Sequence, residues 1–531
     1  MAKVEERPER RPLLLIPGVV MAKKERRGAV EYEHVGTEYM EDRKLERHAG
    51  KLLIWGLGVG YVISGEYFSW NFGLDAGGFG GMLIATLLMI GLYVLMIYNI
   101  SEMATAFPHT GGPYAFARRT MGPWGGFAIG IAAILEYVLA TAAIAITIGA
   151  YITALPCCDS LPSILGLTPV AWLAILAYVI FVGINIAGVQ QTLSSVLVIT
   201  VIAVAMLIVW ALVMLFSGDF STSNFTNIQP EGGNSDLFPF GFIKGTLAAL
   251  PFAAWFYLAI EGVPMASEET RDPARDLPQG TILAMWTLVA LSAIAFFVGV
   301  GVGSAEGIRT SLNPIPNVVS IAQGENFFFW LVTIVGLCGL LASFFSIIFA
   351  YSRIIFSLSR AGYFPRALSV TGTRRTPYIA LIVPAVLACI LIVLYNESAD
   401  AVANIVQMSV FGALVTYVLM MVAFILFRRN EPNAERPYRS PVGVPGAVVV
   451  IAIAVLAMFS SLAYDVPGAK FGVAATIIAI VAGLIYFGAY SRHRLVAEAP
   501  EEEFAVMERA EAELDAAETA AAEERRRETT T

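Results

Sequence analysis

The chain has 531 residues, of which 57% are hydrophobic and 14% are charged, and its mean hydropathy is +0.70. Ordinary soluble domains carry about 25% charged residues, so this composition excludes a soluble globular protein and indicates a polytopic membrane protein. The net charge of -8 arises largely from the acidic segment after residue 495, so it does not indicate a basic partner, and no nucleic-acid partner is expected.

Residues 1–50 form a charged segment that lacks sustained apolar periodicity. We expect a flexible cytosolic tail there, or a short amphipathic cap. The run LLLIPGVV is too short for a membrane span and contains Pro17, so no signal peptide is predicted. The repeated MAK at Met1 and Met21 leaves the start of translation open.

Apolar stretches of about 20 residues are long enough to cross the hydrocarbon core of a membrane as helices. The sequence predicts twelve such spans, and hence an all-α fold. They lie at residues 52–74, 79–106, 126–155, 169–188, 192–216, 241–266, 280–304, 327–356, 378–396, 401–427, 443–463 and 470–490.

The basic residues support this count, because Lys and Arg collect in short cytoplasmic loops. If the N-terminus is cytosolic, the only ones of the 34 basic residues that fall outside are Lys244, Arg309 and Lys470. One missed or additional span would distribute the basic residues over both sides of the membrane. We therefore predict a multi-pass protein of the plasma membrane, embedded in the lipid bilayer, with both termini in the cytosol and an acidic tail at 495–531.

Carboxylates inside the predicted spans indicate a substrate or ion pathway, because each costs at least about 2.5 to 3.5 kcal/mol at the bilayer centre. In the first span Glu66 follows Ser64 and Gly65, a pair that weakens a helix. In the sixth span Glu261 lies just before Pro264. Two interrupted helices in corresponding places are typical of secondary transporters built from inverted repeats.

Two further acids lie in the second and third spans. Glu102 is near the cytosolic end of its span, where Arg118 or Arg119 could neutralise it. Glu136 lies about 15 Å into its span at 1.5 Å per residue. It either lines the cavity or pairs with a donor on a neighbouring helix.

Three segments in chain order resemble the amino acid, polyamine and organocation permeases: PHTGGPYAFARRTMGPWGG, WFYLAIEGVPMASEETRDPARDLPQG and YSRIIFSLSRAGYFPRAL. Within that superfamily, GYVISGEYFSWNFGL and the second span that follows are similar to the ethanolamine permease branch. The resemblance implies a leucine-transporter-like fold with broken helices 1 and 6. Its inverted repeats would cover 51–216 and 217–428, with two peripheral helices at 429–494.

The resemblance also implies a substrate site at the first interruption. Amino acid carriers of this superfamily bind the substrate carboxylate at the backbone amides where helix 1 resumes, here Ser64 and Gly65. Glu66 would repel a carboxylate there and attract an ammonium. The predicted function is therefore import of a small cationic amine, most simply ethanolamine. Glu66 or Glu136 would hold the ammonium, or Glu66 would only set the charge of the pocket.

Aromatic side chains are expected to complete this site, because an aromatic face attracts an ammonium by roughly 0.5 to 2 kcal/mol. Trp255 aligns with an aromatic residue that gates substrate in related permeases, whereas Trp70 either joins the pocket or anchors the helix at the outer membrane surface. The expected substrate-binding residues are Ser64, Gly65, Glu66, Tyr67, Glu136, Trp255, Tyr257, Ala259 and Glu261.

The coupling ion stays open between H+ and Na+. The fifth span has no lysine of the kind that some proton-coupled relatives carry, whereas Glu261 matches an acid implicated in the pH response of antiporter relatives. A sodium site would use Ser343 and Ser346, although serines in helices usually bond to the preceding turn. No other metal and no cofactor is expected.

A cytosolic gate is expected from Glu102, Glu268, Glu269 and Arg353, in which the loop acids pair with Arg353 or with Arg360. Two other functions stay open: a general amino acid permease, and a membrane sensor with a transporter fold. An enzyme is not expected, because the chain has neither an HExxH pair nor a nucleophile-and-base arrangement. The oligomeric state is open between monomer and homodimer.

Overall fold

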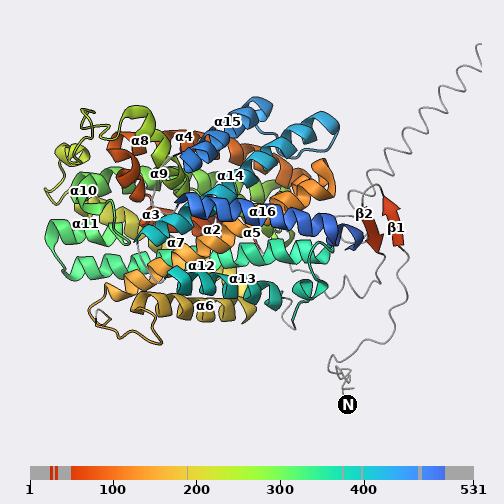
Figure 1. The fold of residues 1–531 in the computed structure, drawn as a ribbon, viewed down its shortest axis with the longest axis horizontal. Coiled ribbons are helices and arrows are strands. Elements are labelled where there is room, and N and C mark those ends of the chain that lie inside the picture. Colours follow the sequence, from red (N-terminus) through yellow and green to blue (C-terminus); the bar gives the residue numbers. More distant parts are fainter. Residues whose placement is uncertain are drawn as a thin grey trace, which may run out of the picture.

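The computed structural model describes residues 24–27, 30–33, 49–109, 111–158, 160–187, 189–372, 376–395, 399–463 and 469–496. Most of these residues are helical, and the long helices pack side by side into one bundle (Figure 1). Within the described ranges, ten helices are long enough and apolar enough to cross a membrane. The composition-based prediction of a helical membrane protein is confirmed at this level.

The helices of the first half follow the predicted spans. They are α2 (Lys51–Val62), α3 (Ser64–Tyr67), α4 (Phe72–Ala106), α5 (Pro113–Thr153), α6 (Pro169–Ala187) and α7 (Val189–Leu215). Both α4 and α5 bend at a glycine in the left-handed region, Gly78 with φ 67° and Gly122 with φ 74°. Gly78 therefore separates the end of the first predicted span from the second.

The second half begins with the 3-10 helix η1 (Thr222–Thr226) and contains the longest uninterrupted apolar helices. The elements that follow are α8 (Phe242–Trp255), η2 (Ile260–Glu269), α9 (Pro273–Gly303), α10 (Ala305–Ile308), α11 (Pro314–Gln323), α12 (Phe327–Arg360), η3 (Arg366–Ser369), α13 (Tyr378–Tyr395), α14 (Ala399–Asn430), α15 (Gly443–Ala463), α16 (Ala469–Ala489) and η4 (Ser491–His493).

Ten of the twelve predicted spans coincide with the ten helices that are long and apolar enough to cross a membrane. The other two correspond to α2 with α3, which together form an interrupted helix, and to α13, which is apolar but shorter. The order of elements therefore follows the prediction.

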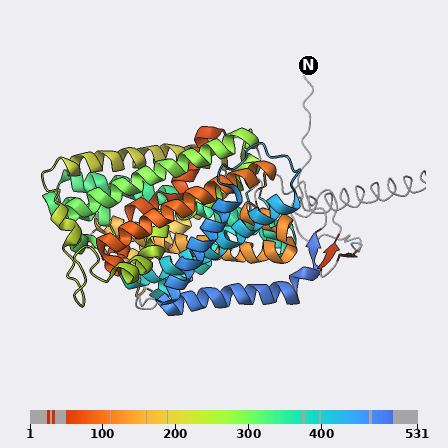
Figure 2. The same cartoon turned by 90° about the horizontal axis from the view of Figure 1, so that it is seen from above.

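The centre of the bundle is built on α5, which packs against α12 and α14, while α4 packs against α8. By contrast, α16 lies along the outside of the bundle (Figure 2). Large apolar side chains are exposed on the peripheral helices, among them Val179, Leu212, Leu387 and Ile478. Extended apolar surface of this kind is typical of a membrane-facing protein.

A three-stranded sheet lies at one end of the bundle (Figure 1). The strand β1 (Lys24–Arg27) pairs antiparallel with β2 (Val30–Glu33), and β2 pairs parallel with β3 (Leu495–Val496). The sequence prediction placed no strand in either tail. These strands are short, and β1 and β2 are charged. They are ordered by pairing between opposite ends of the chain, which local sequence does not reveal.

Candidate functional site

Helix 1, the first predicted span, consists of α2 and α3, and the chain leaves helical geometry directly after α3. Phe68 is extended, with φ -160° and ψ 167°, and Ser69 has a φ of 75°, in the left-handed region. The sequence places this break at Ser64 and Gly65, but both residues are helical in α3. The predicted break adjoins the turn at Ile63 that separates α2 from α3, but the main departure from helical geometry comes later, at Phe68 and Ser69.

Gly65 is required for a close approach between two helices. A β-carbon on Gly65 would lie 2.5 Å from the carbonyl oxygen of Trp255 and 3.1 Å from the α-carbon of Phe256. Only a residue without a side chain fits there. Helix 1 therefore touches helix 6 through its backbone, beside the end of α8.

Helix 6, the sixth predicted span, consists of α8 and η2, and it is interrupted directly after Trp255. The chain turns through 256–259, and Ala259 adopts the left-handed conformation with φ 75° and ψ 4°. That conformation costs a residue other than glycine about 1–2 kcal/mol. The sequence places the break at Glu261, which precedes Gly262 and Pro264, but the helix ends earlier and Glu261 lies in the first turn of η2. Both interruptions are present, each at a shifted position.

Two aromatic pairs join the interruptions. The rings of Phe68 and Trp255 meet edge to face, with centroids 5.3 Å apart, and those of Trp70 and Phe256 stack at 5.6 Å. Such pairs contribute about 0.5–1.5 kcal/mol beyond their buried area. Trp70 is fully buried in the protein, so its alternative role as an interfacial anchor is wrong.

Glu66 is completely buried, and neither of its carboxylate oxygens has a hydrogen-bond partner among the described residues. Its backbone carbonyl, by contrast, accepts a hydrogen bond from Nε1 of Trp70 at 3.1 Å. The indole N–H of Trp255 is also buried without a partner in the described part of the chain. Unsatisfied buried groups are costly, and they indicate a place that is completed by a ligand or a proton.

Tyr67, which follows Glu66 in the chain, and Tyr257, which lies in the turn after α8, are held by hydrogen bonds. The Tyr67 hydroxyl donates to the Ala203 carbonyl at 2.8 Å, and the Tyr257 hydroxyl lies 2.5 Å from that of Ser292. At most 3% of the surface of Ser64, Glu66, Tyr67, Trp255 and Tyr257 is exposed. A ligand can reach this place only after the helices move apart.

The two serines predicted for sodium differ in their contacts. Ser343 donates to the Tyr61 carbonyl at 2.6 Å and lies 2.7 Å from the Ser64 hydroxyl, so it bonds across to helix 1. Ser346 donates to the Ala342 carbonyl one turn back in its own helix at 2.8 Å. Such back-bonding is the ordinary behaviour of a helical serine. Sodium binding by the two residues stays a prediction.

A second group of acids lies between α5, η2 and α14. The Tyr137 hydroxyl donates to Oε1 of Glu261 at 2.8 Å, and the Tyr417 hydroxyl lies 2.9 Å from Oε2 of Glu261 and 3.3 Å from Oε1 of Glu136. Of the two alternatives for Glu136, the structure shows pairing with a donor on a neighbouring helix. Sequence reasoning missed Tyr417, because a tyrosine in an apolar span carries no distinguishing signal.

The ion pair expected between a loop acid and Arg353 is present. Arg353 of α12 and Glu269 at the end of η2 lie 2.8 Å apart, with side chains that are 1% and 3% exposed. The backbone of Ala49 bonds to both sides of this acid, since its N–H donates to the Glu269 carbonyl and its carbonyl accepts from Arg271, each at 2.8 Å. The side chain of Glu268 lies outside the described residues. The gating role of the pair stays a prediction.

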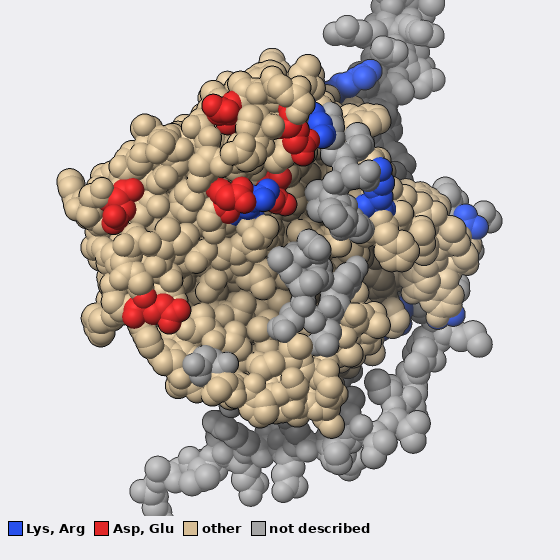
Figure 3. Space-filling model, turned by 60° about the vertical axis from the view of Figure 1, so that its left-hand side comes forward, with Lys and Arg blue, Asp and Glu red and all other residues tan. Residues whose placement is uncertain are grey.

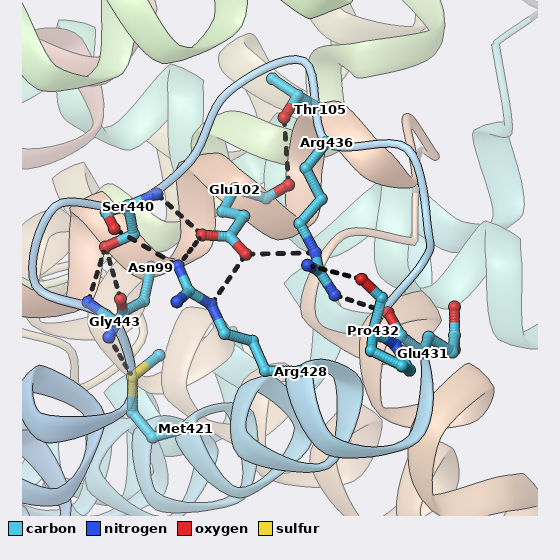
Figure 4. A network of polar contacts seen from close by, with 10 residues as sticks. All are labelled: Asn99, Glu102, Thr105, Met421, Arg428, Glu431, Pro432, Arg436, Ser440 and Gly443. Atoms are coloured by element: carbon cyan, nitrogen blue, oxygen red, sulfur yellow. Dashed lines mark hydrogen bonds and ion pairs between the residues drawn. The ribbon is translucent and has the colours of Figure 1, made fainter.

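Glu102 is neutralised by other arginines than predicted (Figure 4). Arg428 contacts both of its oxygens, at 3.0 and 2.5 Å, Arg436 lies 3.4 Å away, and the Ser440 N–H donates at 2.7 Å. Arg119, an expected partner, bonds to Glu431 instead. The network ties α4 to the α14–α15 loop, because the basic ends of distant helices meet on one face of the bundle.

Comparison with known proteins gives a family match over most of the chain. The amino acid permease family matches residues 54–500. An uncharacterized transporter of Rhizobium meliloti is 30% identical over 422 residues, which cover 78% of this chain and 87% of that protein. The branched-chain amino acid permease BcaP of Bacillus subtilis is 25% identical over 76% of this chain and 85% of its own. The methylthioribose transporter of the same species is 24% identical over 82% of this chain and 91% of its own.

Proposed function

Because this chain belongs to the amino acid permease family, we propose that it is a secondary transporter of a small amine that lacks a carboxylate, most simply ethanolamine. The observation that carries the substrate assignment is the buried, unpaired carboxylate of Glu66 beside the two helix interruptions. In this proposal, the substrate ammonium is its missing partner.

Two of the residues with unsatisfied groups, Glu66 and Trp255, suit the two polar groups of an amino alcohol in kind. Glu66 offers two acceptor oxygens to an ammonium, and the Trp255 N–H offers one donor to a hydroxyl oxygen. A zwitterionic amino acid would bring its own carboxylate into a closed site that already holds an acid. Like charges in a low-dielectric site repel strongly, so this acid favours an amine without a carboxylate.

The end of the bundle opposite the β-sheet is acidic in its described side chains (Figure 3). A surface of this sign raises the local concentration of cations and speeds their association. The described acids of this end outnumber its bases: Asp75, Asp219, Glu231, Asp236, Glu306 and Glu325 against Lys244, Arg309 and Lys470.

The transport cycle we propose is alternating access in a twelve-span protein of the plasma membrane with cytosolic termini. Two inverted repeats would place the interrupted helices α2–α3 and α8–η2 in corresponding positions. Their backbone contact at Gly65 and Trp255 and the closed aromatic pairs around it support an occluded site between the repeats. Opening would require these pairs to separate on one side at a time.

The second candidate function is a general amino acid permease, which is favoured by the family and by the name of the branched-chain relative. It requires Glu66 to be protonated when substrate binds, so that the carboxylate meets no like charge. The named substrate of another relative, methylthioribose, is not an amino acid, so the family alone does not decide between the two.

Competition in proteoliposomes tests the assignment. Purified full-length protein is reconstituted, and uptake of radiolabelled ethanolamine is measured against unlabelled ethanolamine, alanine, lysine and leucine. The proposal expects ethanolamine to compete best. Stronger competition by alanine, lysine or leucine would support the general permease. Saturable ligand binding without flux would support the sensor.

A further inference from the structure

We propose that a pocket at the predicted cytosolic surface binds an anionic phospholipid of the inner membrane leaflet, with Lys51 and Arg275 holding the lipid phosphate. The pocket lies between the start of α2, the first half of α9 and the loop that joins α14 to α15. Its volume is about 710 Å³, and ligand pockets typically have about 300–1,000 Å³. The inference does not depend on the transported substrate, because the pocket is separate from the site around Glu66.

One face of α9 changes from polar to apolar along the pocket. Its lining residues there include Arg275, Gln279, Leu283 and Trp286. Their spacing of three and four residues puts them on the same side of the helix. Arg275 and Gln279 precede the predicted membrane span, which begins at residue 280, whereas Leu283 and Trp286 lie inside it. A phospholipid has the same order, with charge at the membrane surface and acyl chains below.

The charged side chains that line the pocket are two bases and one acid, Lys51, Arg275 and Asp272. All three residues are exposed, and none of them forms an ion pair within the described part of the chain. Two bases and one acid leave an excess of one positive charge. A lipid such as phosphatidylglycerol, whose phosphate carries one negative charge, balances this excess. Basic pockets on the cytosolic side of membrane proteins bind anionic headgroups in this way.

Aromatic side chains lie at the level where the lipid headgroups are expected to meet the acyl chains. Trp286 is 48% exposed, and its indole N–H donates to the Tyr98 hydroxyl of α4 at 3.3 Å. Tyr438 lines the wall that the α14–α15 loop forms. Trp and Tyr are enriched at this level of a membrane. Beside them Leu283 exposes an apolar side chain on which an acyl chain can pack.

The loop wall of the pocket is fixed without a ligand. Its lining residues are Pro437 and Tyr438. They lie between Arg436 and Ser440, which both contact the buried carboxylate of Glu102 (Figure 4). The network that ties α4 to this loop therefore also holds the pocket open for a lipid. A preformed site loses less conformational freedom when a ligand binds.

The start of α2 is held against α9 beside the pocket. A β-carbon on Gly280 of α9 would lie 2.6 Å from Cγ2 of Ile54 and 3.0 Å from the carbonyl oxygen of Lys51. Lys51 and Arg275 thus extend from backbone segments that pack together, and one phosphate can contact both. A lipid bound by both bases would tie α2 to α9 and stabilise the folded protein.

Native mass spectrometry of the detergent-solubilised full-length protein tests this site. The protein is titrated with phosphatidylglycerol, and with phosphatidylcholine and phosphatidylethanolamine of the same acyl chains. We expect phosphatidylglycerol to bind most tightly. The double variant Lys51→Gln with Arg275→Gln should bind it about 25-fold more weakly, since each base near a charged headgroup contributes roughly fivefold. The matched control is Lys244→Gln with Arg429→Gln, which removes two exposed bases outside the pocket and should leave binding unchanged.

Asp272→Asn separates recognition of the phosphate from recognition of a headgroup amine. The Asp272 side chain caps no backbone N–H of α9, so the substitution should not disturb the helix. It removes a like charge beside the phosphate and should strengthen the binding of phosphatidylglycerol. If phosphatidylethanolamine binds more tightly than phosphatidylglycerol and Asp272→Asn weakens it, the amine is recognised and the assignment to an anionic lipid is wrong.

Equal binding of the three lipids, or equal loss in the pocket variant and its control, would overturn the proposal. Displacement of phosphatidylglycerol by inorganic phosphate, at an ionic strength matched with chloride, would also overturn it, because the pocket would then be a site for a free anion. If the double variant does not fold, Lys51→Gln and Arg275→Gln are measured singly. Each should bind about fivefold more weakly, and unchanged affinity in both would contradict the site.

Discussion

The α-carbon of Gly65 faces the carbonyl oxygen of Trp255 so closely that a β-carbon would lie 2.5 Å from that oxygen. This contact joins the two interrupted helices at the place where the unpaired carboxylate of Glu66 is buried. The position of that acid therefore depends on a glycine one residue before it. The backbone contact between Gly65 and Trp255 therefore sets where the side chains of the site lie.

Gly65→Ala should reduce both stability and transport, because the added methyl group forces the helices apart. Overpacking of this kind costs about 1–3 kcal/mol. The matched control is Gly91→Ala in α4, where a β-carbon would meet nothing within 4 Å. Thermal unfolding of detergent-solubilised protein and initial uptake rates are the measurements. Equal melting temperatures for the two alanine variants would contradict the close approach.

Ala259→Gly should be tolerated, whereas Ala259→Val should not. The residue has φ 75° and ψ 4°, which glycine adopts freely and a β-branched side chain strongly resists. We expect the valine variant to lose at least about 1–2 kcal/mol relative to the glycine variant. The same unfolding assay measures this difference. A valine variant as stable as the glycine variant would show that helix 6 is not turned in this way.

Glu269→Gln should open the cytosolic side of the protein. It leaves Arg353 buried without its anionic partner, and such a loss typically costs about 3–5 kcal/mol. In a background without native cysteines, a Ser64→Cys reporter should react faster with a thiol reagent applied from the cytosolic side. The double variant Glu269→Gln with Arg353→Gln should recover part of the lost stability, because no unpaired charge remains. An unchanged labelling rate would show that the ion pair of Glu269 with Arg353 is not part of the cytosolic gate.

Glu102→Gln should lower stability without changing the apparent affinity for substrate. The acid is buried, and Arg428 and Arg436 depend on it, so its loss should cost about 3–5 kcal/mol. The control is Glu306→Gln, which loses a pair with Arg309 whose side chains are 30% and 50% exposed. Such a pair contributes about 0–1 kcal/mol. A change in KM for Glu102→Gln in transport assays would contradict a purely structural network.

Hydrophobic runs predict the helices well in this chain, since the eighth predicted span at 327–356 lies within α12 (Phe327–Arg360). They place span boundaries near both kinks, since the first predicted span ends before Gly78 and the third begins after Gly122, but they do not predict that one helix continues across each kink. Nor do they predict the exact interruptions. Gly65 lies in a helix although its low helix propensity favours a break there, because the close contact with helix 6 requires a residue without a side chain.

The buried acids can be found from sequence, because charge is rare inside a span, but their partners cannot. Glu136 bonds to Tyr417, which is far along the chain, and Glu102 bonds to Arg428 on the same distant helix. The strands at residues 24–27 and 30–33 depend likewise on distant pairing, because the second of them pairs with Leu495 and Val496. Each of these contacts is set by how helices and chain ends meet in space, and a single sequence contains no signal for that.

Uptake of ethanolamine by Glu66→Gln protein, reconstituted beside wild type and beside Glu66→Asp, tests the central proposal most directly. Glutamine keeps the size of the side chain but removes the charge, so ethanolamine uptake should fall to background. Aspartate keeps the charge on a shorter side chain and should retain part of the uptake. Folding is checked by the melting temperature, which should not fall in the glutamine variant, because the buried carboxylate has no partner to lose. Wild-type rates of ethanolamine uptake in Glu66→Gln would contradict the assignment of this acid to the substrate ammonium.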